Sequence, residues 1–352
     1  MTRNDLLKRL SIEHPIIQAP MAGGPTTPEL VAAVSNAGGL GSLGAAYLTP
    51  SQITEAIRQI RLLTDQPFNV NLFAGGYEAR PHADAGPMLA VLAEVHEELG
   101  LPPPVLAEPA IDPFPEQFEA VLQARPAVFS FTFGMPDAYA MTRLKKSGMA
   151  ALGTATTVEE VYRLVEAGVD GIVAQGAEAG GHRGTFGAAF ETSMVPVLDL
   201  VAGIVAALPV PVIGSGGLMD GRDITAAMKR GASAVQLGTA FLTCPESGAS
   251  AAYKRALLDA RTDTTVVTRV FSGRPARGLR NAFIVRLEGK EDVILPYPLQ
   301  NALTRPMRTA AARKGDSGFL SLWAGQGVAR VRVLPAAELV RHLVEEMKEA
   351  SR

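Results

Sequence analysis

Short apolar runs alternate with longer amphipathic stretches along the first two thirds of the chain. Short runs bounded by glycine or proline are typical of buried strands, and stretches with a helical apolar period are typical of helices. The pattern predicts eight strands, at Ile16–Pro20, Leu40–Leu43, Phe68–Phe73, Ala127–Phe131, Ala150–Leu152, Gly171–Ala174, Pro211–Ile213 and Ala234–Leu237.

Helix-length segments separate most of these strands, as at Pro28–Ala37, Ser51–Leu63 and Met88–Leu99. Several end in glycine, which suits the left-handed residue that follows a helix. Alternating strands and helices require a parallel sheet with right-handed crossovers, and eight such units favour a closed barrel. We therefore predict an α/β fold, a (βα)8 TIM barrel, with a doubly wound open sheet as the alternative.

The pattern weakens after Cys244, although helices are still predicted at Ser250–Asp259, Asn301–Arg313 and Glu338–Lys348, and a strand at Thr265–Phe271. These elements are too few to form a second barrel. We predict that residues 1–245 form the barrel. Residues 246–352 are expected to form a smaller C-terminal region that covers the barrel mouth and packs back on the barrel.

Composition narrows the possible functions. With 47% hydrophobic residues, the 352-residue chain can bury a sizeable core, and its net charge of −2 gives no indication of nucleic-acid binding. A single cysteine excludes a disulfide framework or a multi-cysteine metal site and suits a reducing compartment. No apolar run reaches the roughly 18 residues that span a bilayer. The N-terminus also lacks a signal-peptide core, so we expect a cytoplasmic protein without a membrane anchor.

The loop at Gln175–Gly184 is the strongest candidate for chemistry. It follows the predicted strand at Gly171–Ala174 and contains four glycines and one imidazole, that of His182. Glycine lets the backbone approach a ligand closely, and a histidine at the mouth of a parallel sheet can move protons near neutral pH. The alternative is an inert surface histidine. No second ligand lies at metal-binding spacing, so we expect no metal.

Two glycine turns follow the predicted seventh and eighth strands, in Val212–Leu218 and Val235–Thr239. Backbone N–H groups of such turns, together with a helix N-terminus, bind anions. The corresponding loops of eight-fold barrels often form a phosphate site. The sequence therefore favours a phosphate site over two tight turns without a ligand.

A third glycine-rich stretch, Gly39–Gly44, matches the dinucleotide fingerprint letter for letter. That fingerprint requires a strand before the first glycine and a helix after it. Here the glycines follow a helix and lie within a strand. We interpret them as positions of close backbone packing and reject a Rossmann NAD site.

Three further features allow two interpretations each. Asn69 and Asn71 share one face of their strand, and Asn71 could bond a polar ring or a neighbouring backbone group. The basic run Ser272–Arg280 could hold an anion or line the entrance, but a solvated charged turn is favoured. Trp323 lies next to Ala324-Gly325 and could cover an aromatic ligand or anchor the core.

Several of these motifs together resemble the nitronate monooxygenase family, formerly called 2-nitropropane dioxygenases. The segments that carry the resemblance are Pro15–Gly23, Phe68–Phe73, Gln175–Gly184, Gly214–Asp223, Gln236–Phe241 and Trp323–Gly327. They span nearly the whole chain in order. The Glu-Ala-Gly-Gly-His loop and the Gly-Ser-Gly-Gly turn also occur in FMN-dependent enoyl reductases, but the first and last segments favour the monooxygenases.

The resemblance implies FMN as the cofactor, alkyl nitronate and dioxygen as the small-molecule partners, and His182 as the catalytic residue. Met21 would lie against the flavin, and Asn71 and Gln175 would bond its ring. The resemblance further implies that the cofactor is held by Gly180, Gly216, Gly217, Gln236, Gly238 and Thr239, and that Asn69, Tyr297 and Trp323 line the substrate pocket. Subunit number stays open, with a homodimer among the arrangements allowed.

Three other functions are alternatives to nitronate oxidation. An NAD(P)H-dependent FMN reductase of quinones or enoyl thioesters could use the same barrel. A relative of IMP dehydrogenase would need a cysteine nucleophile after the sixth strand, where this chain has none. A non-catalytic flavin-binding protein would keep the phosphate turns without requiring His182.

Overall fold

The computed structural model describes residues 3–75, 77, 84–106 and 112–352. In this part of the chain, eight parallel strands form one sheet in the order β1-β9-β8-β6-β5-β4-β3-β2. A parallel bridge from Ile17 in β1 to Leu40, beside β2, closes the sheet into a barrel. The predicted TIM barrel is confirmed, and the open sheet is wrong.

The bounds of the elements agree with the prediction to within a few residues for all eight barrel strands. The barrel strands are β1 (Ile16–Gln18), β2 (Gly41–Gly44), β3 (Phe68–Phe73), β4 (Val128–Thr132), β5 (Ala150–Ala155), β6 (Gly171–Gln175), β8 (Val212–Ser215) and β9 (Ala234–Leu237). The helices around them are α1 (Arg3–Leu10), α2 (Pro28–Asn36), α3 (Pro50–Leu63), α5 (Phe114–Ala124), α6 (Ala138–Ser147), α7 (Val158–Glu166), α8 (Val197–Ala207) and α9 (Gly221–Lys229).

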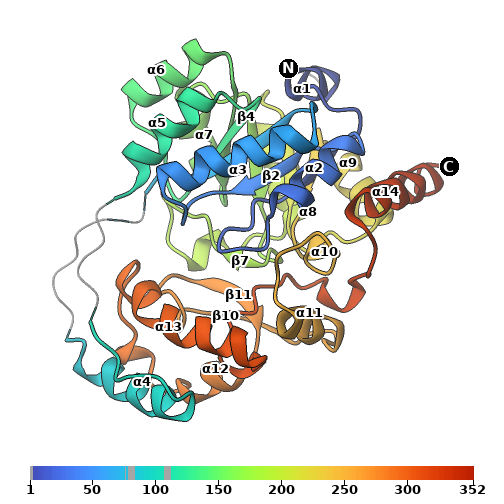
Figure 1. Cartoon of the computed structure of the whole chain (residues 1–352). Helices are drawn as coiled ribbons and strands as arrows, with labels where there is room; N and C mark the ends of the chain where they lie inside the picture. The colour runs from blue at the N-terminus through green and yellow to red at the C-terminus, as the bar shows by residue number, and fades with distance from the viewer. Residues whose placement is uncertain (1–2, 76, 78–83, 107–111) are drawn as a thin grey trace.

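The remaining elements lie mostly at the mouth of the barrel. They are α4 (Gly86–Glu98), β7 (Gly181–His182), α10 (Thr239–Leu242), α11 (Ala251–Leu258), β10 (Thr265–Thr268), β11 (Ala276–Leu279), α12 (Ala282–Arg286), α13 (Leu299–Lys314) and α14 (Ala336–Ala350). Strands β10, β11 and β7 form a small antiparallel sheet. In Figure 1 the barrel occupies the upper half, and α4, α12 and α13 lie together below it.

Local sequence explains where the barrel helices begin. Thr49 precedes α3, and its hydroxyl accepts from the Gln52 N–H while the Gln52 side chain accepts from the Thr49 N–H. This capping box satisfies two N–H groups that a helix start leaves free. Proline at the first helical position, as at Pro50 and Pro28, fits because that position needs no N–H donor.

The packing of α2 on β2 explains the misleading glycine fingerprint. A Cβ added to Gly41 would lie 2.0 Å from the carbonyl oxygen of Val31, so only glycine lets this helix approach the strand. Gly39 and Gly44 are similarly enclosed by backbone atoms. The interpretation of Gly39–Gly44 as barrel packing is confirmed.

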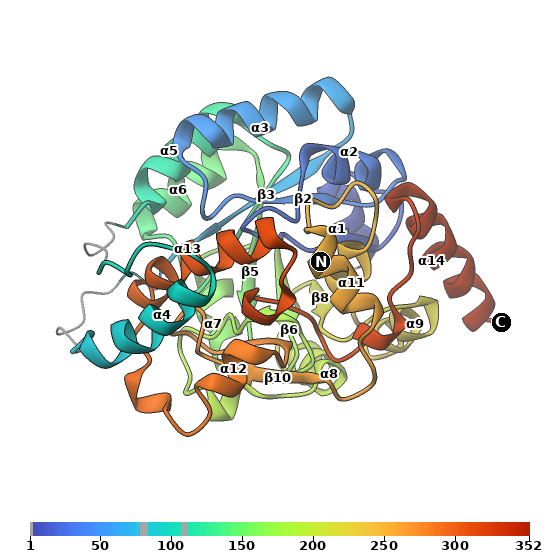
Figure 2. The same cartoon turned by 60° about the horizontal axis from the view of Figure 1, so that its bottom comes forward.

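Three hydrophobic clusters hold the molecule together. One lies between the barrel and its outer helices and includes α14 residues such as Leu339. Another fills the amino-terminal end of the barrel, where Leu6 and Leu10 of α1 close the interior. The third joins α4, α11, α12 and α13 at the mouth of the barrel, the side that is turned toward the viewer in Figure 2. Elements from both sides of residue 245 enter the first and third clusters, and the division of the chain there stays a prediction.

Candidate active site

A cavity of about 650 Å³ opens at the carboxyl ends of the barrel strands. Its walls come from strand ends and post-strand loops of the barrel, and from α11, α13 and residues 320–325 of the C-terminal region. Among the described residues, three arginines line it, Arg305, Arg308 and Arg313, and no aspartate or glutamate does. The cavity is therefore suited to anionic ligands.

His182 forms part of the cavity wall in β7, where it pairs with Ala276 of β11. Its ring lies 5.3 Å from the Trp323 ring and 5.8 Å from the Phe133 ring, measured between centroids. The Ser272 Oγ lies 2.8 Å from Nε2 and fixes the orientation of the ring. The enclosed setting lowers the pKa of His182 to about 3, assisted by the nearby Arg274 and Arg308. The imidazole is therefore neutral at physiological pH.

Gln175 holds the loop that carries His182. Its Oε1 accepts from the Gly184 N–H at 2.7 Å, and its Nε2 donates to the His182 carbonyl at 2.9 Å. A primary amide has two N–H donors, so one hydrogen of Nε2 is left for a ligand in the cavity. Arg183 stabilises the same loop. Its buried guanidinium donates to the carbonyls of Gln175, Gly176 and Ser193.

The turn after β8 presents backbone donors to the cavity. Gly216 and Gly217 have φ values of +132° and +68°, which favour glycine, and both line the cavity together with Leu218. Within the described part of the chain, the N–H groups of these three residues have no hydrogen-bond partner. Such a row of free N–H groups is the arrangement that binds a phosphate.

The N-terminus of α9 contributes no free donors. Asp220 accepts from the N–H groups of Arg222 and Asp223, Asp223 accepts from Met219, and Glu346 of α14 accepts from Gly221. The sequence predicted an anion site made of the turn and this helix end together. In the structure, protein carboxylates already satisfy the helix end, which leaves the turn as the donor.

The C-terminal region completes the side of the cavity that the two glycine turns form. The Thr239 Oγ1 accepts from the Gly325 N–H at 2.9 Å, which joins the turn after β9 to the segment beside Trp323. A Cβ on Gly180 would lie 2.5 Å from backbone atoms of Ala324 and Gly325. This contact explains why the loop needs glycine there.

Most of the residues predicted from the sequence meet at this one cavity. Those that line it are Met21, Asn71, Gln175, Gly180, His182, Gly216, Gly217, Gln236, Gly238, Thr239 and Trp323. Asn69 does not line the cavity; it is buried in the barrel and donates to the Ser130 Oγ, as Asn71 also does. Tyr297 is buried behind the wall, with its ring centroid 6.4 Å from that of His182.

The basic run at Ser272–Arg280 is not a solvated turn, and the favoured interpretation of it is wrong. Ser272 and Arg277 are buried, and Ala276–Leu279 forms β11 between β10 and β7. Burial lowers the pKa of Arg277, whose Nε donates to the Ala177 carbonyl. The charged residues of this short run made the sequence look like a turn, so the strand β11, which pairs with His182, was not predicted.

Arg308 is the main site residue that the sequence did not reveal. Burial lowers its pKa to about 10, and it donates to the carbonyl and the Oδ1 of Asn301. No carboxylate of the described residues forms an ion pair with it. Its spacing from Arg305 on one face of a predicted helix was the only signal.

Comparison with known proteins decides the family. The profile of the family described as nitronate monooxygenase matches residues 4–346. The chain belongs to the nitronate monooxygenase family. It is 41% identical to a probable nitronate monooxygenase of Staphylococcus saprophyticus over 342 residues, which are 97% of this chain and 96% of the relative. A probable nitronate monooxygenase of Staphylococcus aureus is 40% identical over 348 residues, 99% of this chain and 98% of the relative.

Solved structures of similar proteins have the same fold. The structure of nitroalkane oxidase from Streptomyces ansochromogenes has a TM-score of 0.90 and 40% identity, with 98% of each chain covered. FabK from Thermotoga maritima is more distant, with a TM-score of 0.78, 28% identity, and coverage of 99% of this chain and 96% of that one. As a member of the nitronate monooxygenase family, the chain is a flavin-dependent oxidoreductase.

Among the described residues, no group of three or more histidine, cysteine, aspartate or glutamate side chains is placed to hold a metal ion. No described helix combines the length and the apolar character needed to cross a bilayer.

Proposed function

We propose that the protein binds FMN in this cavity and oxidises alkyl nitronates with dioxygen to a carbonyl compound and nitrite. The observation that carries the proposal is a cavity whose described lining combines unpartnered backbone donors, three arginines without an aspartate or glutamate, and the imidazole of His182. Membership of the family and the similarity to nitroalkane oxidase support the same activity.

The residues at the cavity fit FMN at both of its ends. The N–H groups of Gly216, Gly217 and Leu218 would hold the phosphate, and Gly238 leaves room for close approach beside Met21. At the ring end, Asn71 and the free hydrogen of the Gln175 amide would bond polar ring atoms. Bound FMN would supply the redox chemistry of the oxidation, and the residues named here would hold it in place.

The substrate is proposed to lie between His182 and the arginines. A nitronate is an anion, and Arg308 provides a positive charge with which no carboxylate of the described residues forms an ion pair. With a neutral nitroalkane, His182 would accept the acidic C–H proton, a role worth roughly 10²–10⁴-fold in rate. The lowered pKa keeps His182 in the unprotonated form that a base requires, and it disfavours a protonated His182 that holds the anion. Trp323 would shape the pocket as part of its wall. The buried Tyr297 and Asn69 would shape it from behind the wall.

Oxygen uptake with propyl-2-nitronate tests the activity, and oxygen uptake with the corresponding neutral nitroalkane tests the base role of His182. His182→Ala is expected to keep the yellow, FMN-bound protein and to lose most of its turnover of neutral nitroalkanes. His342→Ala is the matched control, since this histidine is exposed on α14 and paired only with glutamates. Unchanged turnover of the neutral nitroalkane in His182→Ala would remove the base assignment, and a colourless protein that takes up no FMN would remove the whole proposal.

A second arm of the same experiment separates the competing reductase. NADH plus quinone is supplied anaerobically, without a nitro compound. Rapid NADH consumption would favour the NAD(P)H-dependent reductase, and its absence beside fast nitronate oxidation would favour the proposal. A homodimer is proposed for the assembly, and sedimentation of the holoenzyme checks it.

A further inference from the structure

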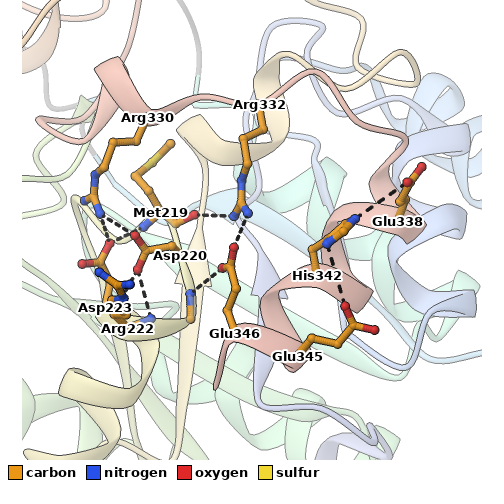
Figure 3. A network of polar contacts seen from close by, with 11 residues as sticks. Met219, Asp220, Arg222, Asp223, Arg330, Arg332, Glu338, His342, Glu345 and Glu346 are labelled. Carbon is orange, nitrogen blue, oxygen red and sulfur yellow. Dashed lines mark hydrogen bonds and ion pairs between the residues drawn. The ribbon is translucent and has the colours of Figure 1, made fainter. Parts of the chain in front are cut away.

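A polar network joins the C-terminal segment to the turn that faces the cavity. Figure 3 shows Arg330 beside Asp220 and Asp223, and Arg332 between Met219 and Glu346. Arg330 Nη1 lies 3.0 Å from Asp220 Oδ2 and 2.8 Å from Asp223 Oδ2. Its Nη2 donates to the Gly217 carbonyl at 3.1 Å. One guanidinium thus contacts both carboxylates at the α9 terminus and the backbone of the glycine turn.

The bond to Gly217 has a directional consequence. In a trans peptide the carbonyl and the following N–H point in opposite directions. Because Arg330 holds the Gly217 carbonyl on the outer side of the turn, the Leu218 N–H is directed the other way. Leu218 and Gly217 line the cavity, and the Leu218 N–H has no partner among the described residues.

The two carboxylates create an electrostatic problem for the cofactor. Asp220 and Asp223 flank the same turn and are needed there, because they cap α9 and accept from Met219. A phosphate bound at Gly216–Leu218 would be repelled by both of them. Arg330 compensates one of their two charges at direct contact distance, and no other basic side chain of the described residues forms an ion pair with either.

We propose that Arg330 is a positioning residue for the phosphate of the flavin nucleotide, which orients the Gly217–Leu218 peptide toward the phosphate and offsets the charge of Asp220 and Asp223. This inference rests on the proposed binding of FMN. It assigns part of the selectivity for a phosphorylated flavin to a residue that does not line the cavity.

The test compares FMN with riboflavin, which lacks the phosphate. Flavin-stripped protein is titrated with each, and binding is followed by quenching of flavin fluorescence. Arg330→Gln is expected to lower the affinity for FMN on the order of tenfold at low salt, because it removes a few charge interactions in a high-dielectric setting. The loss should be smaller at high salt, which screens these interactions. Riboflavin affinity is expected to change less than about twofold, because it carries no charge at this position.

Two further variants separate charge from folding. Arg330→Gln combined with Asp220→Asn and Asp223→Asn keeps the caps, since asparagine is also a good cap, and should recover most of the lost FMN affinity. Arg332→Gln is the matched control, because Arg332 pairs with Glu346 and holds the Met219 carbonyl instead of Gly217. It should leave the ratio of FMN to riboflavin affinity unchanged.

The results distinguish the two proposals. If Arg330→Gln weakens the binding of FMN and of riboflavin equally, the role of Arg330 is merely structural. If FMN binding is unchanged, Arg330 has no role. Either result overturns the inference and leaves the proposed function standing. Wild-type protein that binds neither flavin would overturn both.

Discussion

Glu160 is the buried carboxylate on which the loop after His182 depends. It is fully buried and accepts five hydrogen bonds. Oε1 accepts from the Thr185 hydroxyl and from the N–H groups of Phe186 and Gly187, and Oε2 accepts from the Thr156 N–H and hydroxyl. Replacement by glutamine keeps the shape but turns one acceptor into a donor.

The expected loss follows from these contacts. If the glutamine oxygen faces the three donors on the loop, its NH₂ group faces the Thr156 N–H. That buried backbone donor then has no acceptor, which costs about 1–3 kcal/mol. The remaining bonds lose the strength that an ionised acceptor adds. We therefore expect Glu160→Gln to lower the free energy of unfolding by about 2–4 kcal/mol at neutral pH.

The pH dependence gives an independent check. Burial alone would raise the pKa of Glu160, but bonds from the N–H groups of Gly187, Phe186 and Thr156 outweigh it and hold the pKa below its ordinary value. A carboxylate with a lowered folded-state pKa stabilises the fold above the unfolded value, near 4.3, and stops doing so as pH falls through the folded value. The difference between wild type and Glu160→Gln should therefore be full at pH 7 and shrink below about pH 4.

Denaturant unfolding followed by circular dichroism measures this difference. Glu159→Gln is the control, because it removes a charge from the same helical turn at an exposed position. If Glu160→Gln lowers the free energy of unfolding by less than about 1 kcal/mol, or by no more than Glu159→Gln does, the hydrogen bonds to Glu160 do not stabilise the fold as argued.

Three further predictions concern the cavity and the core. Gly180→Ala should release flavin faster on gel filtration, because its Cβ would lie 2.5 Å from the Ala324 backbone, whereas Gly203→Ala has ordinary 3.5 Å contacts and should retain it. Oxidation of neutral nitroalkanes should show no His182 titration between about pH 5 and 8, because the pKa is lowered to about 3; a step near pH 6.5 that vanishes in His182→Ala would contradict this. Cys244 should resist iodoacetamide in the native protein, because burial raises its thiol pKa to about 12; rapid labelling would show that the site opens.

The barrel was predictable because its signals are local. Most strands are short apolar runs, and several barrel helices begin at a capping residue, as α3 does after Thr49, so the topology followed from the order of the elements. The glycine turns at Gly216 and Gly238 were predictable for the same reason, since their positions after the seventh and eighth strands place them at one end of the barrel.

The rest of the site depended on long-range contacts that the sequence does not encode locally. Arg308 enters the cavity from α13, far along the chain from His182, and its burial could not be inferred from a helix rich in basic residues. Strand β11 was missed because its arginine and glycine suggested solvent exposure. The capping of α9 by Glu346 requires α14 to pack there, which only the fold shows.

The bond between Thr239 and Gly325, with Ala324 packed on Gly180, has a consequence for biosynthesis. A nascent chain that has just completed its last barrel strand would have the glycine turns but lack the segment that closes over them. Cofactor loading is therefore expected to be a late event, after the segment that contains Ala324 and Gly325 has left the ribosome. A protein shortened before Trp323 is expected to retain less flavin than the full chain.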